Sequence, residues 1–411
     1  MSQFWFLSAP LFSHTDWGGF LKTAQALRAR GHEVLWVSER PLAGPIASVG
    51  LPFAEIAHTG WLWPPPPAPD LSTLVPAEAV MLRYRRALDT WLSEDLVGLA
   101  VDDLLALAAE RGRPDALVTD PFLSASAIAA EKLGIPLIVC GWIAQADLNE
   151  DSLFPVQKAL AHESVGRIER LCARFGVQGV NFASGPTPSV LSPRLHISYF
   201  NAAWYQSDAG TILPQTQFAG GRAETPVTPA PDWLAAIPDD LPLAFITLGT
   251  IFTGDLGFYS WAAQAAARAG LLPVIALGWN PIAPGDKAQL KAALPAGARL
   301  LNYAPLDHVL PRCRLIIHHG GMGTTHAGVL HGLPQIAVPH AADQRGNARR
   351  IAQSLVGISL TAHDVKQGAL LSGARALLTD MQVQENARRL AEDFAALGGP
   401  ARAAELIETV G

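Results

Sequence analysis

The sequence predicts an α/β fold of two domains, each built on a parallel sheet with flanking helices. Residues Gln3–Ser8 and Glu33–Ser38 are short apolar runs typical of strands, and the helix-forming segment Gly18–Arg30 lies between them. This strand–helix–strand order indicates a parallel sheet. A second such pattern starts at Leu243–Leu248, and 411 residues with 49% hydrophobic content suffice for two cores.

The segment Leu213–Asp232 separates the two patterns. It contains several prolines and a Gly-Gly pair, a composition typical of a linker. A Gly-Gly-Pro break then sets off a last helical segment. The predicted divisions are an N-terminal domain at 1–213, a linker at 214–232, a C-terminal domain at 233–397 and a final helix at 398–411.

Composition excludes several classes of protein. The net charge of −6 provides no basic footprint for nucleic acid. No apolar run approaches the ~20 residues of a membrane span, and the N-terminus lacks the charged start and cleavage site of a secretory signal. We therefore expect a cytoplasmic protein. Cys140, Cys172 and Cys313 are odd in number and scattered, which argues against a disulfide framework or a zinc site.

The most informative stretch follows a predicted strand at Arg314–Ile317. It consists of a glycine-rich turn, His318–Gly323, and then Thr324 and Thr325, which we predict to cap a short helix that ends at Gly332. The free N–H groups and positive dipole end of a helix start bind anions, and glycines let a phosphate come close. The dinucleotide fingerprint and the P-loop both fail to match, and no metal-chelating Asp-x-Asp occurs in the chain.

This stretch resembles the donor signature of nucleotide-sugar glycosyltransferases of the GT-B fold. That group includes plant secondary-product enzymes and bacterial enzymes that modify macrolides and other natural products. The matching residues are His319, Gly321, Thr324, Gly332, Pro334, Pro339, Asp343, Gln344 and Asn347. The resemblance implies two Rossmann-like domains whose parallel sheets face each other across a cleft, with the C-terminal helix crossing back to the N-domain.

The resemblance also implies roles for the donor site. The diphosphate would contact Thr250, His319, Gly321, Gly323 and Thr324, and Asp343 and Gln344 would contact sugar hydroxyls. Tyr303 would stack on the nucleotide base.

Three of these residues have open alternatives: Asp343 could cap the following helix, Tyr303 could be a half-buried core residue, and Thr250 could belong to an ordinary strand-to-helix turn. Many family members have Glu where this chain has Ala327. That Glu holds the ribose hydroxyls, so both UDP- and dTDP-linked donors stay open.

His14 lies in the loop after the first strand. It could be an ordinary exposed loop residue, but the family carries a catalytic histidine in this loop, ahead of a Gly-His-x-Val segment that is Gly31–Val34 here. Histidine can accept a proton from an acceptor hydroxyl at neutral pH. Asp120 follows a predicted strand, and by resemblance it orients this base, although it could instead cap the next helix. Asp16 is a rival for the orienting role.

The acceptor-binding residues are expected in loops of the N-terminal domain. Trp61 and Trp63 lie at the start of a proline-rich segment that could be either a pocket wall or a rigid connector. Trp142 lies in a second loop, and Phe122 follows Asp120.

Together these features predict an inverting glycosyltransferase that moves a hexose from a UDP- or dTDP-sugar to a hydroxyl of a small lipophilic acceptor. We expect no metal and no cofactor beyond this co-substrate, no nucleic-acid partner, and a monomer or weak homodimer. Two alternatives remain: a nucleotide-sugar 2-epimerase of the same fold, and a non-catalytic nucleotide-sugar-binding protein.

Overall fold

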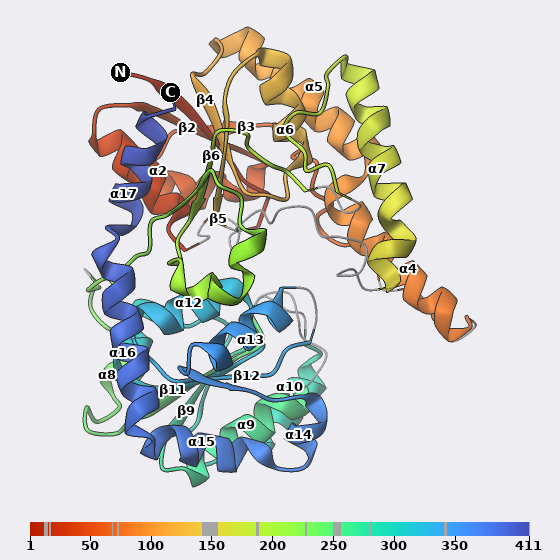
Figure 1. The fold of residues 1–411 in the computed structure, drawn as a ribbon. Helices are drawn as coiled ribbons and strands as arrows, with labels where there is room; N and C mark the ends of the chain where they lie inside the picture. The colour runs from red at the N-terminus through yellow and green to blue at the C-terminus, as the bar shows by residue number, and fades with distance from the viewer. Residues whose placement is uncertain are drawn as a thin grey trace. The chain divides into compact units, whose positions relative to one another are not determined.

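The computed structural model describes residues 1–11, 15, 18–67, 69–71, 74–141, 155–185, 189–226, 228–249, 256–278, 282–340 and 343–410. The chain forms two compact units (Figure 1). Unit 1 comprises Met1–Ala202, Asp208–Ala219 and Gly398–Gly411, and unit 2 comprises Ala203–Ser207 and Gly220–Leu397.

In the described part of unit 1, parallel strands form a sheet in the order β3-β2-β1-β4-β5-β6-β7. The inner strands are buried on both faces, which explains their continuous apolar sequences. The strands are β1 Gln3–Leu7, β2 Glu33–Ser38, β3 Phe53–Glu55, β4 Ala116–Thr119, β5 Leu137–Gly141, β6 Leu195–Ser198 and β7 Thr216–Phe218. The prediction missed β3, and β7 lies within the segment predicted as a linker.

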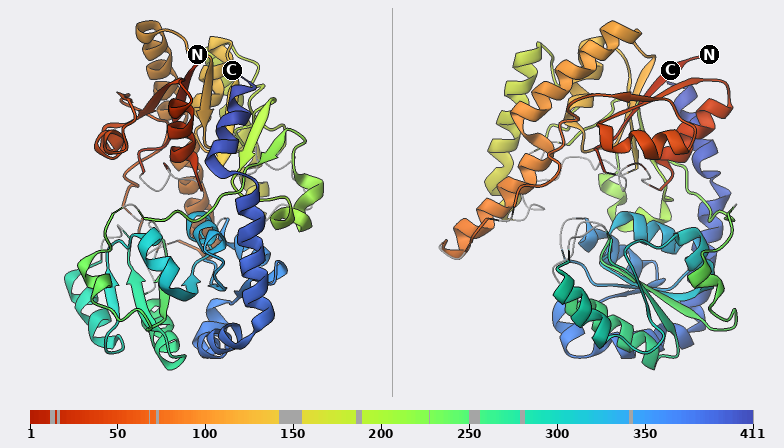
Figure 2. Two further views of the ribbon diagram at one scale, coloured as in Figure 1. Left: turned by 90° about the vertical axis from the view of Figure 1, so that its left-hand side faces the viewer. Right: turned by 180° about the vertical axis from the view of Figure 1, so that it is seen from behind.

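Helices cover both faces of this sheet (Figure 2). One face packs against α4 Pro76–Leu92, α5 Glu94–Arg111, α6 Ser124–Leu133 and α7 Pro155–Phe175. The other face packs against α2 Phe20–Ala29, α3 Ala43–Ser48 and α17 Gly399–Glu408. Two 3-10 segments, η1 Arg40–Leu42 and η3 Ala203–Thr211, complete the local structure.

The last helix, α17, packs on α2 within unit 1. Ala403 and Ile407 are fully buried in the same cluster as Leu27. At the end of the helix, Glu408 accepts two hydrogen bonds of 2.7 Å from the guanidinium of Arg30, and it lies 2.8 Å from Nε2 of His32. Hydrophobic burial and an ion pair therefore both hold α17 on unit 1.

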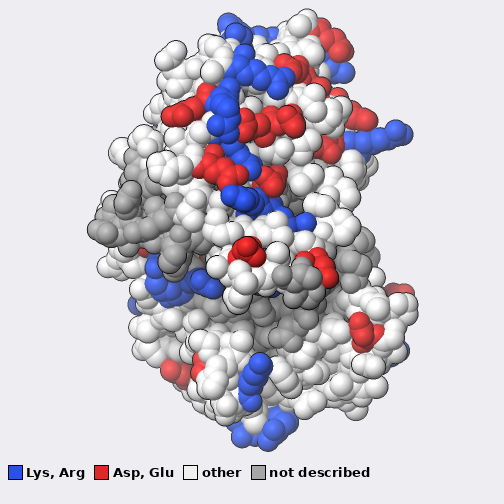
Figure 3. Space-filling view, turned by 90° about the vertical axis from the view of Figure 1, so that its right-hand side faces the viewer, with Lys and Arg blue, Asp and Glu red and all other residues white. Residues whose placement is uncertain are grey.

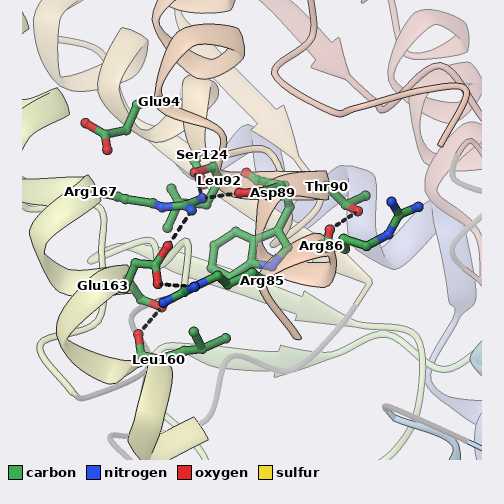
Figure 4. Close-up of polar contacts among 12 residues, drawn as sticks. Arg85, Arg86, Asp89, Thr90, Leu92, Glu94, Ser124, Leu160, Glu163 and Arg167 are labelled. Carbon is green, nitrogen blue, oxygen red and sulfur yellow. Dashed lines mark hydrogen bonds and ion pairs between the residues drawn. The ribbon is translucent and has the colours of Figure 1, made fainter. Parts of the chain in front are cut away.

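Charged side chains join α7 to α4 and α5. Basic and acidic side chains alternate along this face of unit 1 (Figure 3). Arg167 is the most buried member, with a side chain that is 13% exposed. It donates to Asp89 at 2.7 Å, to Glu163 at 2.6 Å and to the carbonyl of Leu92 at 3.0 Å (Figure 4). This residue links α7 to the C-terminal end of α4.

The described part of unit 2 has a second parallel sheet, in the order β10-β9-β8-β11-β12-β13. Its strands are β8 Leu243–Thr247, β9 Leu272–Ala276, β10 Arg299–Leu301, β11 Cys313–His318, β12 Gln335–Ala337 and β13 Gly357–Ser359. The helical segments are α8 Asp232–Ala235, α9 Leu256–Arg268, α10 Pro284–Ala293, α11 Leu306–Val309, η4 Leu310–Arg312, α12 Met322–Leu330, α13 Gln344–Gln353, α14 Ala362–Lys366, α15 Ala369–Thr379 and α16 Met381–Ala396. None of the described helices combines the length and apolarity that crossing a bilayer would require.

Candidate active site

Each sheet reverses its strand order at one point. In unit 1 the reversal lies between β1 and β4, and in unit 2 it lies between β8 and β11. Open α/β sheets bind ligands outside the carboxyl ends of the strands at such a point. Asp120 follows β4 and His319 follows β11, so these two predicted residues lie at the two switch points. His14 comes after β1 in the sequence and Thr250 after β8, and both lie outside the described residues.

In unit 2, the turn after β11 is built around His319, which is 7% exposed. A Cβ added to Gly321 would lie 2.7 Å from Cε1 of the His319 ring, and one added to Gly249 would also lie 2.7 Å from it. Both distances are shorter than real Cβ contacts. Two glycines from two different loops therefore make the space for this imidazole.

The helix α12 begins directly after this turn. Its N-cap is Gly321, in an extended conformation, so Met322, Gly323 and Thr324 form the first turn. The prediction that Thr324 and Thr325 cap the helix is wrong, because both lie inside it. Gly323 is exposed and Thr324 is partly exposed. The helix start is thus accessible at the point where a phosphate would need backbone N–H groups.

Both histidines of the turn are neutral at physiological pH. Burial, together with the neighbouring His318 and His340, lowers the pKa of His319 to about 3. Burial also lowers the pKa of His318 to about 4. Before any ligand binds, His319 therefore offers a phosphate an N–H hydrogen bond rather than a positive charge.

Asp343 is the N-cap residue of α13, but its side chain does not cap that helix. This observation contradicts the alternative that explained Asp343 by capping alone. Its carboxylate instead accepts hydrogen bonds from the backbone N–H of Met322 and from Nδ2 of Asn347, the latter at 3.1 Å. Burial raises the pKa of Asp343 to about 6, against the effect of the backbone N–H groups of Asp343 and Met322 and of Arg350. The carboxylate thus lies against the first turn of α12.

Gln344 and Tyr303 differ in their exposure. Gln344 is buried, and its Oε1 accepts from the backbone N–H of His340 at 2.8 Å, which holds the loop before α13. Tyr303 lies between β10 and α11 and is 55% exposed. The alternative that made Tyr303 a half-buried core residue is therefore wrong.

In unit 1, Asp120 follows β4 and is fully buried. Its Oδ1 accepts from the backbone N–H of Phe122 at 2.7 Å. The next helix, α6, has Leu123 as its N-cap and no side-chain cap, so the capping alternative for Asp120 is wrong. The ring of Phe122 meets Trp61 edge to face, with centroids 6.1 Å apart. Three predicted residues of the N-terminal domain thus lie side by side.

The other predicted residues of this site divide into two groups. Trp63 is described and is 38% exposed. His14, Asp16, Trp142 and Thr250 lie outside the described residues. Within the residues that the structure describes, no group of three or more His, Cys, Asp or Glu side chains is placed to hold a metal ion.

The sequence interpretation gave no specific role to Gly249 or Asn347. Asn347 was part of the matching stretch, and its spacing of four residues from Asp343 places the two side chains on one face of a helix. That spacing was a usable signal for their contact. No local signal indicates that Gly249 contacts His319, because the two residues are 70 positions apart and meet only through the pairing of β8 with β11.

Comparison with known families decides the class of this protein. The model of the erythromycin biosynthesis protein CIII-like C-terminal domain matches residues 282–410, and the N-terminal domain model of the same family matches residues 25–153. The chain belongs to this family of natural-product glycosyltransferases. The GT-B fold expected from the sequence is confirmed.

Similar proteins cover nearly the whole of this glycosyltransferase. The elloramycin glycosyltransferase ElmGT of Streptomyces olivaceus is 29% identical, over 93% of this chain and 91% of its own. A crystal structure of the kitacinnamycin glycosyltransferase superposes with a TM-score of 0.74 at 21% identity, covering 99% of this chain and 98% of its own. Spinosyn rhamnosyltransferase SpnG gives a TM-score of 0.69 at 22% identity, covering 99% of this chain and all of its own, in complexes with thymidine diphosphate and with spinosyn aglycone.

Proposed function

We propose that this glycosyltransferase inverts the anomeric centre while it moves a hexose from a UDP- or dTDP-sugar to a hydroxyl group of a small lipophilic acceptor. One observation carries the proposal. Each sheet has a single reversal of strand order among its described strands: the strand β4 at one reversal is followed by the buried carboxylate of Asp120, and the strand β11 at the other by His319 and the start of α12. Since such positions bind ligands in open α/β sheets, this arrangement supports acid–base chemistry at the first and anion binding at the second.

Unit 2 binds the nucleotide sugar in this proposal. The diphosphate accepts hydrogen bonds from His319 and from the first N–H groups of α12, with Thr250 as a further donor. Such fixed donors stabilise the charge that develops on the leaving diphosphate. Tyr303 has an exposed ring for stacking on the base, and Asp343 and Gln344 contact sugar hydroxyls.

Unit 1 binds the acceptor and supplies the base. His14 takes the proton from the acceptor hydroxyl while its oxygen bonds to the anomeric carbon, and the bond from that carbon to the diphosphate oxygen breaks. Asp120 orients His14 and stabilises the imidazolium that forms. A positioned base contributes ~10²–10⁴-fold. Trp61, Trp63, Trp142 and Phe122 present aromatic faces to a lipophilic acceptor.

One relative and one residue of this chain favour dTDP over UDP as the nucleotide of the donor. SpnG has been crystallised with thymidine diphosphate, and this chain has Ala327 where many family members have a ribose-binding Glu. A dTDP-sugar, which lacks the 2′-hydroxyl, is therefore the first donor to test. We also propose that transfer needs no metal ion and takes place in the cytoplasm. Activity should then be unchanged by EDTA.

Incubation with dTDP- or UDP-sugars and a panel of lipophilic alcohols and phenols tests the function. Transfer to an acceptor supports the proposal. Isomerisation of the donor without an acceptor would identify an epimerase, and binding with neither reaction would identify a non-catalytic protein.

His14→Ala tests the base within the same assay. It should abolish transfer and preserve nucleotide binding, whereas His162→Ala, on the exposed side of α7, should leave transfer unchanged. Equal rates in wild type and His14→Ala would exclude His14 as the base.

A further inference from the structure

The backbone of Gly320 is hydrogen-bonded on both sides. Its N–H donates to Nδ1 of His318 at 3.1 Å, and its carbonyl accepts from Nδ2 of Asn347 at 2.9 Å. Both partner residues are buried: His318 is 0% exposed and Asn347 is 6% exposed. Gly320 has φ +85°, and a Cβ there would lie 2.8 Å from the carbonyl oxygen of Gln344. The residue type and its two partners therefore fix the orientation of the two peptide groups that flank Gly320.

Asn347 also binds the neighbouring loop. The same Nδ2 that donates to the turn donates to Oδ2 of Asp343 at 3.1 Å. The amide nitrogen can make both donations because it carries two hydrogens, whereas a serine hydroxyl donates once and an ionised aspartate does not donate at all. A single side chain thus joins the glycine turn to the carboxylate that lies against α12.

The hydrogen bonds continue below the turn. Because the ring of His318 is neutral and its Nδ1 accepts from Gly320, its proton is on Nε2. The side chain of Gln335 partly opposes the lowering of the His318 pKa by burial. The amide Nε2 of Gln335 donates to the carbonyl of Thr325 at 3.4 Å, inside α12. The hydrogen bonds around the turn therefore run from Asn347 on α13 through Gly320 to His318 at the end of β11, and Gln335 makes a separate contact with α12.

We propose that Asn347 and His318 are positioning residues of the donor site. They hold the two peptide groups that flank Gly320 in the orientation that places His319 and the start of α12 together, and Asn347 holds the Asp343 carboxylate beside them. The inference rests on the proposed function, in which this turn binds the diphosphate of the donor. Neither residue needs to touch the donor. Their loss should weaken recognition of phosphate and leave recognition of the nucleoside intact.

The test compares ligands that differ by one phosphate. Affinities of dTDP, dTMP, UDP and UMP are measured by calorimetry for the wild type and for Asn347→Leu, which keeps the approximate size of the side chain and removes both donors. The ratio of diphosphate to monophosphate affinity should fall roughly tenfold or more in the variant, because a buried carbonyl and a carboxylate lose their donor. Monophosphate affinity should change less than about twofold.

Asn386→Leu is the matched control. Asn386 is 6% exposed, as Asn347 is, and lies in the same unit on α16. Its Nδ2 donates to the carbonyl of Leu355 at 3.2 Å. This variant loses a comparable hydrogen bond away from the glycine turn, so it should keep the wild-type affinity ratio. An equal fall of the ratio in both variants would attribute the effect to general destabilisation and overturn the proposal.

Other outcomes separate the inference from the function. If the wild type binds none of the four nucleotides, the proposed function fails. If the wild type binds them and Asn347→Leu keeps the wild-type ratio, or loses diphosphate and monophosphate affinity equally, the positioning role is refuted. Should Asn347→Leu not fold, Asn347→Ser retains one donor and should show a smaller fall of the same ratio, and an unchanged ratio in that variant refutes the role as well.

Discussion

Replacing Asp343 with asparagine should make this glycosyltransferase more stable at neutral pH. The aspartate carboxylate is partly buried beside the neutral His319 turn, and burial raises its pKa from 3.8 to about 6. The folded state therefore holds the proton more tightly than the unfolded chain does. Wild-type stability accordingly falls as the pH rises from about 4 to about 6 and stays reduced above that range. Asparagine has nearly the shape of the protonated acid and never ionises.

The size of the effect follows from the pKa. A rise from 3.8 to about 6, at ~1.4 kcal/mol per pKa unit, corresponds to ~3 kcal/mol. Asparagine offers a single oxygen to Met322 and Asn347, and a lost hydrogen bond costs ~1 kcal/mol. Asp343→Asn should thus stabilise the protein by ~2 kcal/mol at pH 8 and by close to nothing at pH 4.5. Donor affinity should fall, since the proposed contact to the sugar hydroxyls loses its charge.

Urea denaturation at pH 4.5, 6 and 8 measures the free energy of unfolding for both proteins. The control is Asp286→Asn, at an exposed position in the first turn of α10, which should show no such gain. A gain that is the same at all three pH values would refute the reasoning, as would a loss of stability at pH 8.

The remaining predictions concern the glycine beside His319 and the ion pairs of unit 1. Gly249→Ala should abolish measurable nucleoside diphosphate binding in calorimetry, because its methyl group would displace the His319 ring and φ +78° disfavours alanine; unchanged affinity would show that the ring is free to move. Arg167→Met should lower the free energy of unfolding by ~2 kcal/mol, because it leaves the carbonyl of the buried Leu92 without its donor and removes the cation between Asp89 and Glu163. Arg170→Met, at a side chain that is 61% exposed, should cost ~1 kcal/mol or less, and equal losses would contradict the burial argument. Hydrogen bonds from Arg30 and then His32 lower the pKa of Glu408 to about 2, so Glu408→Gln should lower the free energy of unfolding by ~1 kcal/mol or less at pH 7. In acid unfolding, this stability difference between wild type and variant should fade as the pH falls from 4.5 towards 2. A difference that persists at pH 2 would exclude the Arg30–Glu408 ion pair as its source.

The sequence predicted the elements that have strong local patterns. The strand before His318, the strand–helix–strand start of unit 1 and the glycine turn are all recognisable from apolar runs and from glycine. It missed Phe53–Glu55 and Thr216–Phe218, because a strand of three residues has no measurable period and exists through pairing with distant residues.

Helix capping was the least reliable local rule. Threonine leads glycine among N-cap residues, yet Gly321 is the N-cap of α12, three residues before Thr324, because the turn around His319 fixes the backbone there. Asp120 and Asp343 also follow strands as capping residues would, and neither caps its helix. Asp120 instead accepts from the backbone N–H of Phe122, two residues further on. Asp343 accepts from the backbone N–H of Met322, a contact that only the packing of separate elements can determine.

The return of α17 to unit 1 has a consequence for biosynthesis. The residues of unit 2 at Gly220–Leu397 are translated before α17, whose Ala403 and Ile407 complete the cluster around Leu27. During translation, the apolar side of α2 that packs on α17 therefore stays uncovered until all of Gly220–Leu397 has been made. A nascent chain stalled before Gly398 would display that side to chaperones, and a ribosome-arrested fragment ending there should be captured by them more strongly than one that includes Glu408.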